Sequence, residues 1–217
     1  MEDNVLIAKR VAQELRNGEL VNLESGLPTL ASHFVPSGIE VYFQSENGVI
    51  GMSAVVGKGL QDDYLTDAGG TFIGALPGAC SLDSAGSFGL IRGGHLDLAV
   101  MNGLQVDEAG RLANWIAPGK AVCGIGGSMD LMTGAKRIVV AMSHAAKGVS
   151  NVVKQCTLPI TSTRRVNLIV TNYAVIEPTS RGLVLKETAP GITTDQVVAA
   201  TDARLIIPDN VPEMAVS

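Results

Sequence analysis

Apolar residues follow two different spacings along the chain. From Asn4 to Asn17 they recur at intervals that place them on one face of a helix, and Gly18 then supplies a C-terminal signal. Short continuous runs of Val, Ile and Leu further on are typical of strands buried on both faces. We therefore predict a first helix over 4–17 and strands over 20–23, 39–43, 96–101, 137–142, 166–171, 175–177, 183–185 and 204–207.

Turn-forming residues divide the segments that remain. The segments 104–106 and 111–115 flank a short polar turn and have the composition of a β-hairpin. Glycine is frequent over 65–84, so that stretch is expected to be mostly loop. Short helices are expected over 84–91 and from Thr193 or Thr194 to Ala200. The segment 124–130 is expected to lead into another helix, which ends at Thr133 or Gly134.

Strands that alternate with helices indicate an α/β protein. The pattern predicts an open, mostly parallel sheet covered by helices on both faces. No repeat, charge run or change of composition marks a linker, so one domain over residues 1–217 is expected.

Composition narrows the class of protein further. A net charge of −5 argues against a general nucleic-acid binder, which needs a basic surface. The acidic start and the lack of a long apolar run favour a cytoplasmic protein without a membrane segment. Three scattered cysteines, Cys80, Cys123 and Cys156, indicate neither a disulfide framework nor a zinc site. Glycine, at 25 of 217 residues, points to tight turns or to close approach of a ligand to the backbone.

A carboxylate on a tight turn is the first candidate for chemistry. Ser45-Glu46-Asn47-Gly48 follows a predicted strand, where ligands of open α/β sheets bind. Asn47 and Gly48 both tolerate positive φ and would aim Glu46 into a crevice. From the local spacing alone, an exposed turn residue is the alternative interpretation.

A second candidate is the glycine run from Gly124 to Gly127. Without side chains, its backbone N–H groups can approach an anion or a developing oxyanion. Its spacing matches neither the dinucleotide fingerprint nor a P-loop, and tight strand-to-helix packing is the alternative. The histidines His33, His95 and His144 have no metal-binding spacing and are interpreted as structural, with His95 kept as a weaker candidate.

Several long strings together resemble one known family. The chain is similar to the beta subunit of family I CoA-transferases, which act on acetate, on butyrate and acetoacetate, or on succinyl-CoA and 3-oxo acids. The matching strings run almost from end to end and are 8–15, 21–23, 26–29, 44–48, 67–70, 87–88, 90–95, 112–115, 118–120, 124–131 and 156–159.

The resemblance implies a fold and a covalent mechanism. The fold would be the CoA-transferase type, which is related to that of sugar-phosphate isomerases and deaminases. Glu46 would attack an acyl-CoA thioester and then carry CoA as a glutamyl thioester, with Gly127 as an oxyanion donor. The remaining motif positions would bind substrate and CoA: Asn47, Gly48, Gly26, Gly124 and Gly126. Acyl-CoA is then a substrate, and no metal or permanently bound cofactor is implied.

The resemblance also implies a partner. In this family the beta chain works with an alpha subunit of the same fold, as a heterodimer or an α2β2 heterotetramer. Two alternatives stay open: a non-catalytic acyl-CoA-binding or scaffold subunit, and a sugar-phosphate isomerase or deaminase. The chain departs from the family pattern at Glu24-Ser25, where the family has a glycine loop, and the added bulk and charge would reshape the acyl pocket.

Overall fold

A large mixed sheet organises the protein. In the computed structural model, which describes residues 2–55, 59, 61–116, 119 and 124–216, ten strands form one sheet in the order β15-β14-β13-β12-β8-β5-β1-β2-β3-β4. The strands from β12 to β2 are parallel. Antiparallel pairs extend the sheet on both sides, and β15 then joins β14 in parallel at one edge. The predicted open α/β sheet, mostly parallel and with helices on both faces, is confirmed.

The strands of the large sheet are short at its centre and longer toward its sides, apart from the two-residue edge strand β15. They are β1 (Leu20–Leu23), β2 (Tyr42–Gln44), β3 (Val49–Val55), β4 (Ile73–Ser81), β5 (Leu98–Asn102), β8 (Arg137–Ala141), β12 (Leu168–Val170), β13 (Ala174–Thr179), β14 (Gly182–Thr188) and β15 (Leu205–Ile206). Two small sheets hold β6 (Gln105–Asp107), β7 (Leu112–Ala113) and β11 (Val152–Val153), and β9 (Ala145–Ala146) with β10 (Val149–Ser150).

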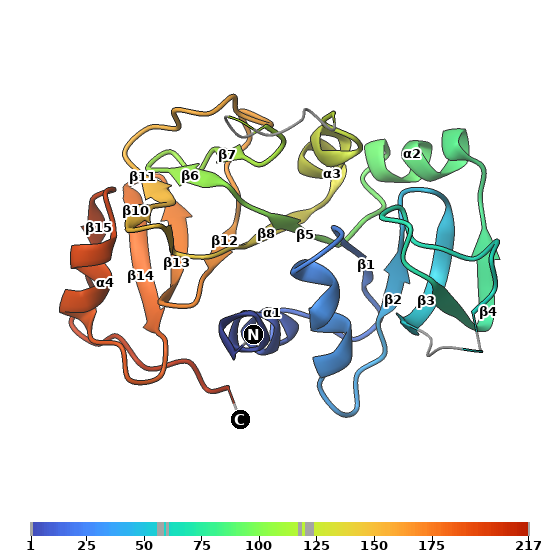
Figure 1. The fold of residues 1–217 in the computed structure, drawn as a ribbon, viewed down its shortest axis with the longest axis horizontal. Coiled ribbons are helices and arrows are strands. Elements are labelled where there is room, and N and C mark those ends of the chain that lie inside the picture. Colours follow the sequence, from blue (N-terminus) through green and yellow to red (C-terminus); the bar gives the residue numbers. More distant parts are fainter. Residues whose placement is uncertain (1, 56–58, 60, 117–118, 120–123, 217) are drawn as a thin grey trace.

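Helices lie on both faces of the central strands. Figure 1 shows α2 (Ser84–Arg92) and α3 (Ser128–Gly134) above them, and α1 (Glu2–Ala12) with the 3₁₀ helix η1 (Pro28–Phe34) below. The helix α4 (Thr194–Ala200) lies beside β14 and β15 at one end of the molecule. The two termini come close together on the α1 side (Figure 1).

Alternation along β5 explains why the sheet has two cores. Leu98 and Val100 pack into the apolar cluster on the α1 side, whereas Ala99 and Met101 pack into the cluster under α3. Successive side chains of a strand point to opposite faces, so a continuous apolar run is required where both faces are covered. This is the physical reason why the central strands could be predicted from their sequence.

Two sequence predictions need correction. The stretch 65–84 is not mostly loop, because β4 occupies residues 73–81 and pairs with β3, which was not predicted as a strand either. The first helix ends at Ala12 and not at Asn17, since the amides of residues 13–15 bond to carbonyls three residues back and tighten the chain into turns. Gly18 still ends this region with a positive φ of 79°.

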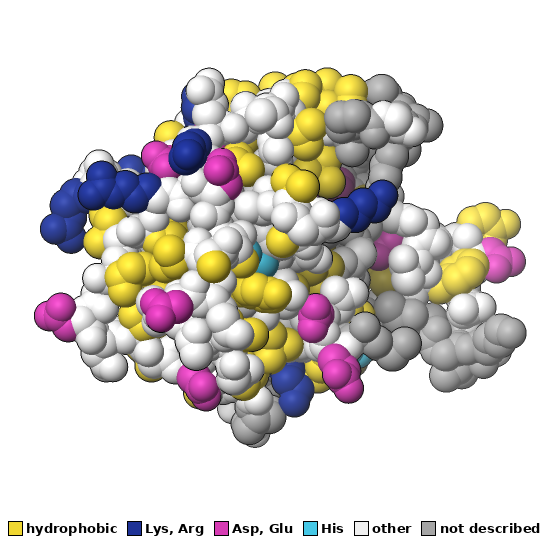
Figure 2. Space-filling view, turned by 60° about the vertical axis from the view of Figure 1, so that its left-hand side comes forward, with side chains coloured by type: hydrophobic (Ala, Val, Ile, Leu, Met, Phe, Trp, Pro, Cys, Tyr) yellow, Lys and Arg dark blue, Asp and Glu magenta, His cyan; other side chains and the backbone are white. Residues whose placement is uncertain are grey.

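Charges of both signs are mixed on the surface. Figure 2 shows acidic and basic side chains interspersed with apolar patches over the described part of one face. No helix among the described residues is long and apolar enough to cross a membrane.

Candidate functional site

Polar residues follow three neighbouring parallel strands at one edge of the sheet. Glu24 comes directly after β1, Glu46 lies two residues beyond β2, and Asn102 ends β5. These strands are adjacent in the order β5-β1-β2, so their carboxyl ends meet. This is the position at which open α/β sheets bind ligands.

The carboxylate of Glu46 is held by an amide from the neighbouring strand. Asn22, in the middle of β1, is fully buried, and its Nδ2 donates to Glu46 Oε2 at 3.1 Å. The same Nδ2 lies 2.9 Å from Gln44 Oε1 and 3.2 Å from Gln44 O. Gln44 in turn donates to Ser87 Oγ on α2 at 3.0 Å. Glu46 therefore sits on a connected set of hydrogen bonds and is not a freely exposed turn residue.

The turn that carries Glu46 is fixed from both sides. The Gly48 amide donates to Ser45 O at 2.9 Å and closes the turn, while Asn47 Nδ2 donates to Thr66 O at 2.8 Å. Gly48 has a φ of 125°, and a Cβ atom placed on it would collide with the carbonyl oxygen of Leu82. Asn47 and Gly48 therefore fix the shape of the turn. The space that a side chain of residue 48 would need is filled by the Leu82 backbone.

Gly127 lies beside Glu46, although the two are far apart in the sequence. A Cβ atom on Gly127 would lie 3.4 Å from Glu46 Cγ and 3.3 Å from two ring carbons of Phe88. Gly127 directly precedes α3 and is buried. The absence of a side chain at this position therefore lets the backbone of residue 127 approach the Glu46 side chain.

The other glycines predicted to bind substrate or CoA have open surroundings. Gly124 and Gly126 are exposed, have φ values of 87° and 55°, and would have no described atom within 4 Å of an added Cβ. Gly26 has a φ of 100°, and its nearest neighbour on that side is Asn102 Oδ1. Pro118, Lys120 and Cys123, which belong to or adjoin the family strings, lie outside the described residues.

Glu24 forms a second polar cluster next to Glu46. Its Oε2 accepts from the Asn102 amide at 2.6 Å and from Asn102 Nδ2 at 3.1 Å. Its Oε1 accepts from Ser128 Oγ at 2.8 Å and from Asn114 Nδ2 at 3.2 Å. Burial raises the pKa of Glu24, these hydrogen bonds oppose the rise, and the nearby charge of Glu46 adds to it.

Four residues of the site were not identified from the sequence. Asn22, Asn102, Asn114 and Ser128 all bond to one of the two carboxylates. Only Asn22 could have been recognised from its local sequence. A single amide side chain inside the apolar run Leu20-Val21-Asn22-Leu23 must find a buried hydrogen-bond partner. The other three lie on separate elements and come together only in the fold.

His144 confirms the structural interpretation given to it. It is fully buried, and its Nδ1 and Nε2 each lie 2.9 Å from a threonine Oγ1, of Thr171 and Thr201 respectively. Burial lowers the pKa of His144 to about 4. The other two histidines, His33 and His95, are exposed. Cys80 and Cys156 are free thiols.

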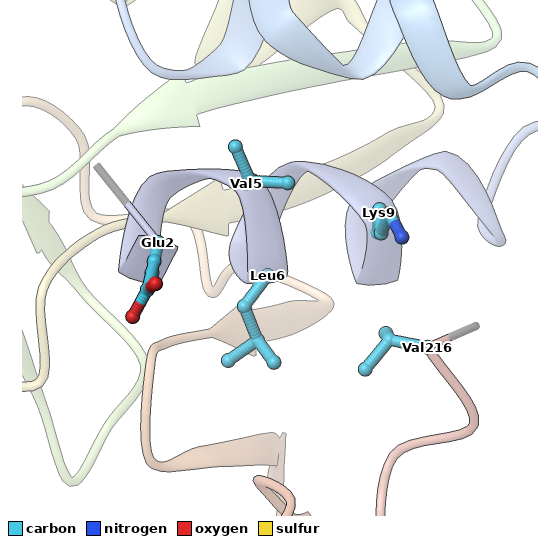
Figure 3. A pocket seen from close by; sticks show the side chains of 5 residues that line it. All are labelled: Glu2, Val5, Leu6, Lys9 and Val216. Atoms are coloured by element: carbon cyan, nitrogen blue, oxygen red, sulfur yellow. The ribbon is translucent and has the colours of Figure 1, made fainter.

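A separate apolar groove lies on the far side of the sheet. It has a volume of about 540 Å³ and is lined by Glu2, Val5, Leu6, Lys9 and Val216 (Figure 3). Its walls come from α1 and the C-terminal segment, so none of the predicted site residues takes part in it.

Comparison with known proteins identifies the family. The model of the coenzyme A transferase family matches residues 5–200. The beta subunit of the acetate CoA-transferase from Haemophilus influenzae is 44% identical over 218 residues, which cover 100% of this chain and 97% of that protein. The B subunit of the succinyl-CoA:3-ketoacid coenzyme A transferase from Helicobacter pylori is 46% identical over 198 residues, with 91% and 95% covered.

A solved structure supports the same fold. An acyl-CoA transferase of Escherichia coli O157:H7 superposes with a TM-score of 0.77 at 22% identity, over 98% of this chain. This chain spans 43% of that longer protein. The chain belongs to the coenzyme A transferase family, and the resemblance to its beta subunits is confirmed.

Proposed function

We propose that the chain is the beta subunit of a CoA-transferase that moves CoA between an acyl-CoA and a short-chain carboxylic or 3-oxo acid. The relatives that are named as beta or B subunits support an alpha partner. We propose that the two chains form a heterodimer or an α2β2 heterotetramer. The observation that carries the proposal is the Glu46 carboxylate, bonded to buried Asn22 and placed against Gly127 at the carboxyl edge of the parallel strands.

Glu46 acts as the nucleophile in this proposal. One carboxylate oxygen attacks the thioester carbonyl, and collapse of the tetrahedral intermediate breaks the C–S bond, which gives an acyl-glutamyl anhydride and CoA thiolate. The thiolate then attacks the glutamyl carbonyl, so that a glutamyl-CoA thioester forms and the first acid leaves as its carboxylate. A second acid reverses both steps and departs as the new acyl-CoA.

The neighbours of Glu46 fit these steps. The Asn22 amide donates to the carboxylate oxygen and orients the side chain, and it can also stabilise negative charge on that oxygen when the thiolate attacks. We assign the backbone N–H of Gly127, where an added Cβ would lie 3.4 Å from Glu46 Cγ, as a second donor, worth on the order of 3 kcal/mol at a developing oxyanion. Asn47, Gly48 and Gly26 shape the mouth of the site, and Gly124 and Gly126 leave room for CoA.

Trapping the thioester tests this function. The chain is combined with its alpha partner and acetoacetyl-CoA, digested, and analysed by mass spectrometry for CoA attached to the peptide that contains Glu46. We expect the adduct on that peptide, and a loss of transfer of at least about 10³-fold in Glu46→Ala because the nucleophile is absent.

The control is an exposed carboxylate near the start of the same strand. Glu40→Gln should keep both the adduct and the transfer rate, since Glu40 precedes β2 and lies away from the carboxyl edge. An adduct on a glutamate of the alpha subunit, or full activity in Glu46→Ala, would contradict the assignment. Tight acyl-CoA binding without any exchange would instead favour the scaffold alternative.

A further inference from the structure

Glu24 is a carboxylate that the proposed reaction leaves without a role. It lies at the end of β1, and its two oxygens accept hydrogen bonds from Asn102, Asn114 and Ser128. All of these donors are neutral. Among the described residues, no Lys or Arg forms an ion pair with Glu24, although other carboxylates of the protein have such partners.

The donors hold the charge in place without cancelling it. A carboxylate has about four lone-pair sites, and two amide side chains, one hydroxyl and one backbone N–H fill them. Burial raises the pKa of Glu24 and these donors oppose the rise, so the donors favour the ionised carboxylate. In that form Glu24 presents an incoming ligand with a fixed negative charge whose hydrogen-bonding positions are already occupied. Such a group selects ligands by charge and less by direct hydrogen bonding.

The charge stands next to the proposed nucleophile. Asn22 of β1 is opposite Gln44 of β2 in the parallel register, and Glu24 and Glu46 each follow two residues later. The start of α3 contacts both, because Gly127 lies against Glu46 while the next residue, Ser128, donates to Glu24. The charge of Glu46 also raises the pKa of Glu24, so the two carboxylates act on each other electrostatically.

We propose that Glu24 is a specificity-determining residue that makes the acyl site favour acids with an ammonium group and reject acids with a second carboxylate. The inference rests on the proposed function, since it assumes that the acyl group is attached at Glu46. Substituents a few bonds away from the Glu46 carboxylate then lie within the range of the Glu24 charge. Like charges brought together in a partly buried site are strongly disfavoured, and opposite charges are favoured.

Three acids of nearly the same shape provide the test. Butyrate ends in a methyl group, β-alanine carries an ammonium group in its place, and succinate carries a carboxylate there. The complex with the alpha subunit is supplied with acetoacetyl-CoA and each acid, and kcat/KM is measured from the acyl-CoA products. We expect Glu24→Gln, which removes the charge and keeps the shape, to shift the ratio of β-alanine to succinate at least about tenfold toward succinate.

Glu40→Gln is the matched control. It removes one carboxylate charge at an exposed position before β2, away from the carboxyl edge of the sheet, so the ratio of β-alanine to succinate should stay within about threefold of the wild-type value. The wild-type complex gives a readout that does not depend on any variant. There, succinate should be a poorer acceptor than butyrate, and the difference should shrink as salt is added.

Two results would separate the failure of this inference from failure of the proposed function. An unchanged ratio in an active Glu24→Gln complex, or a wild-type preference for succinate over butyrate, would overturn the role of Glu24 and leave the transferase intact. Absence of CoA transfer to every acid in the wild-type complex would overturn the proposed function and this inference with it.

Discussion

Burial keeps His144 in its neutral form. The ring stacks on Tyr173 with centroids 5.2 Å apart, and both ring nitrogens face threonine hydroxyls. An imidazolium at this position would lose its hydration without gaining a carboxylate partner among the described residues, which is why the pKa falls to about 4 from an ordinary value of 6.5.

This residue predicts an acid-sensitive contribution to stability. Because the folded-state pKa lies below the unfolded one, the unfolded chain binds the proton first. The stabilisation is complete above pH 6.5 and is lost as the pH falls from 6.5 to about 4, by about 3 kcal/mol in total. Urea unfolding at several pH values should show a shallower slope over this range in His144→Gln than in the wild type.

His33 gives the control for that measurement. It is exposed, so His33→Gln should leave the slope unchanged. An equal slope in the wild type and in His144→Gln would show that the decline has another origin.

The candidate site could be predicted from the sequence only in part. Glu46 and Gly127 could be named because each belongs to a distinctive string, and the structure does bring them together. That Asn22 orients Glu46 could not be foreseen, because the contact depends on how β1 and β2 are aligned. The same holds for Glu24, whose charge was evident but whose neutral partners were not.

At the scale of elements, the turn between β2 and β3 depends on one glycine. Gly48 needs its positive φ, and the Leu82 backbone occupies the space that a side chain would fill. The Leu82 amide also donates to Gly48 O at 2.9 Å, which joins this turn to the end of β4.

Gly48→Ala should therefore be costly in two ways. The strained φ and the collision with a backbone carbonyl together should lower the free energy of unfolding by about 3 kcal/mol or more. Because the displaced turn carries Glu46, the transfer rate should fall as well. The free energy of unfolding can be measured on the isolated chain, and the transfer rate on the purified complex with the alpha subunit.

Gly38→Ala separates strain from collision. Gly38 has a φ of 84° but no described atom within 4 Å of an added Cβ, so only the backbone penalty of about 1 kcal/mol should appear. Equal destabilisation by both substitutions would mean that the contact with Leu82 is not important.

A strand can be predicted from the sequence when its own residues favour a strand, and not when it depends on pairing with a distant segment. The strands β1 and β8 were predicted well because their apolar runs reflect burial on both faces. The strand β4 was missed because Gly74, Pro77 and Gly78 lower its local preference for a strand. Pairing with β3 overrides that preference, and this pairing is absent from the local sequence.

At the scale of the whole molecule, one ion pair joins the first helix to a strand late in the chain, β14. Arg10 of α1 donates through Nε and one terminal nitrogen to the two oxygens of Glu187 on β14, at 2.7 and 2.8 Å. A third bond, at 2.8 Å, reaches Glu14. Arg10 is buried, so the pair is shielded from solvent.

Arg10→Met should destabilise the protein by about 3 kcal/mol, because the Glu187 carboxylate is left without its partner. The double variant Arg10→Met/Glu187→Met should recover most of this loss, since no uncompensated charge remains. If residues 1–217 form one domain, as we propose, both variants should unfold in a single transition in calorimetry.

An exposed pair tests whether burial is the cause. Arg92 donates to Asp130 at 2.6 Å, but its side chain is 67% exposed, so Arg92→Met should change stability by less than about 1 kcal/mol. A comparable loss in Arg92→Met and Arg10→Met would contradict this explanation.

The positions of the hydrogen-bond partners of Glu24 in the sequence also determine when the Glu24 site can form during translation. Asn102, Asn114 and Ser128 follow Glu24 by 78, 90 and 104 positions. A nascent chain that has emerged only as far as β4 therefore contains both carboxylates but none of these donors. The edge of the sheet that carries them must stay hydrated until α3 has left the ribosome, because ionised groups are not buried without compensation.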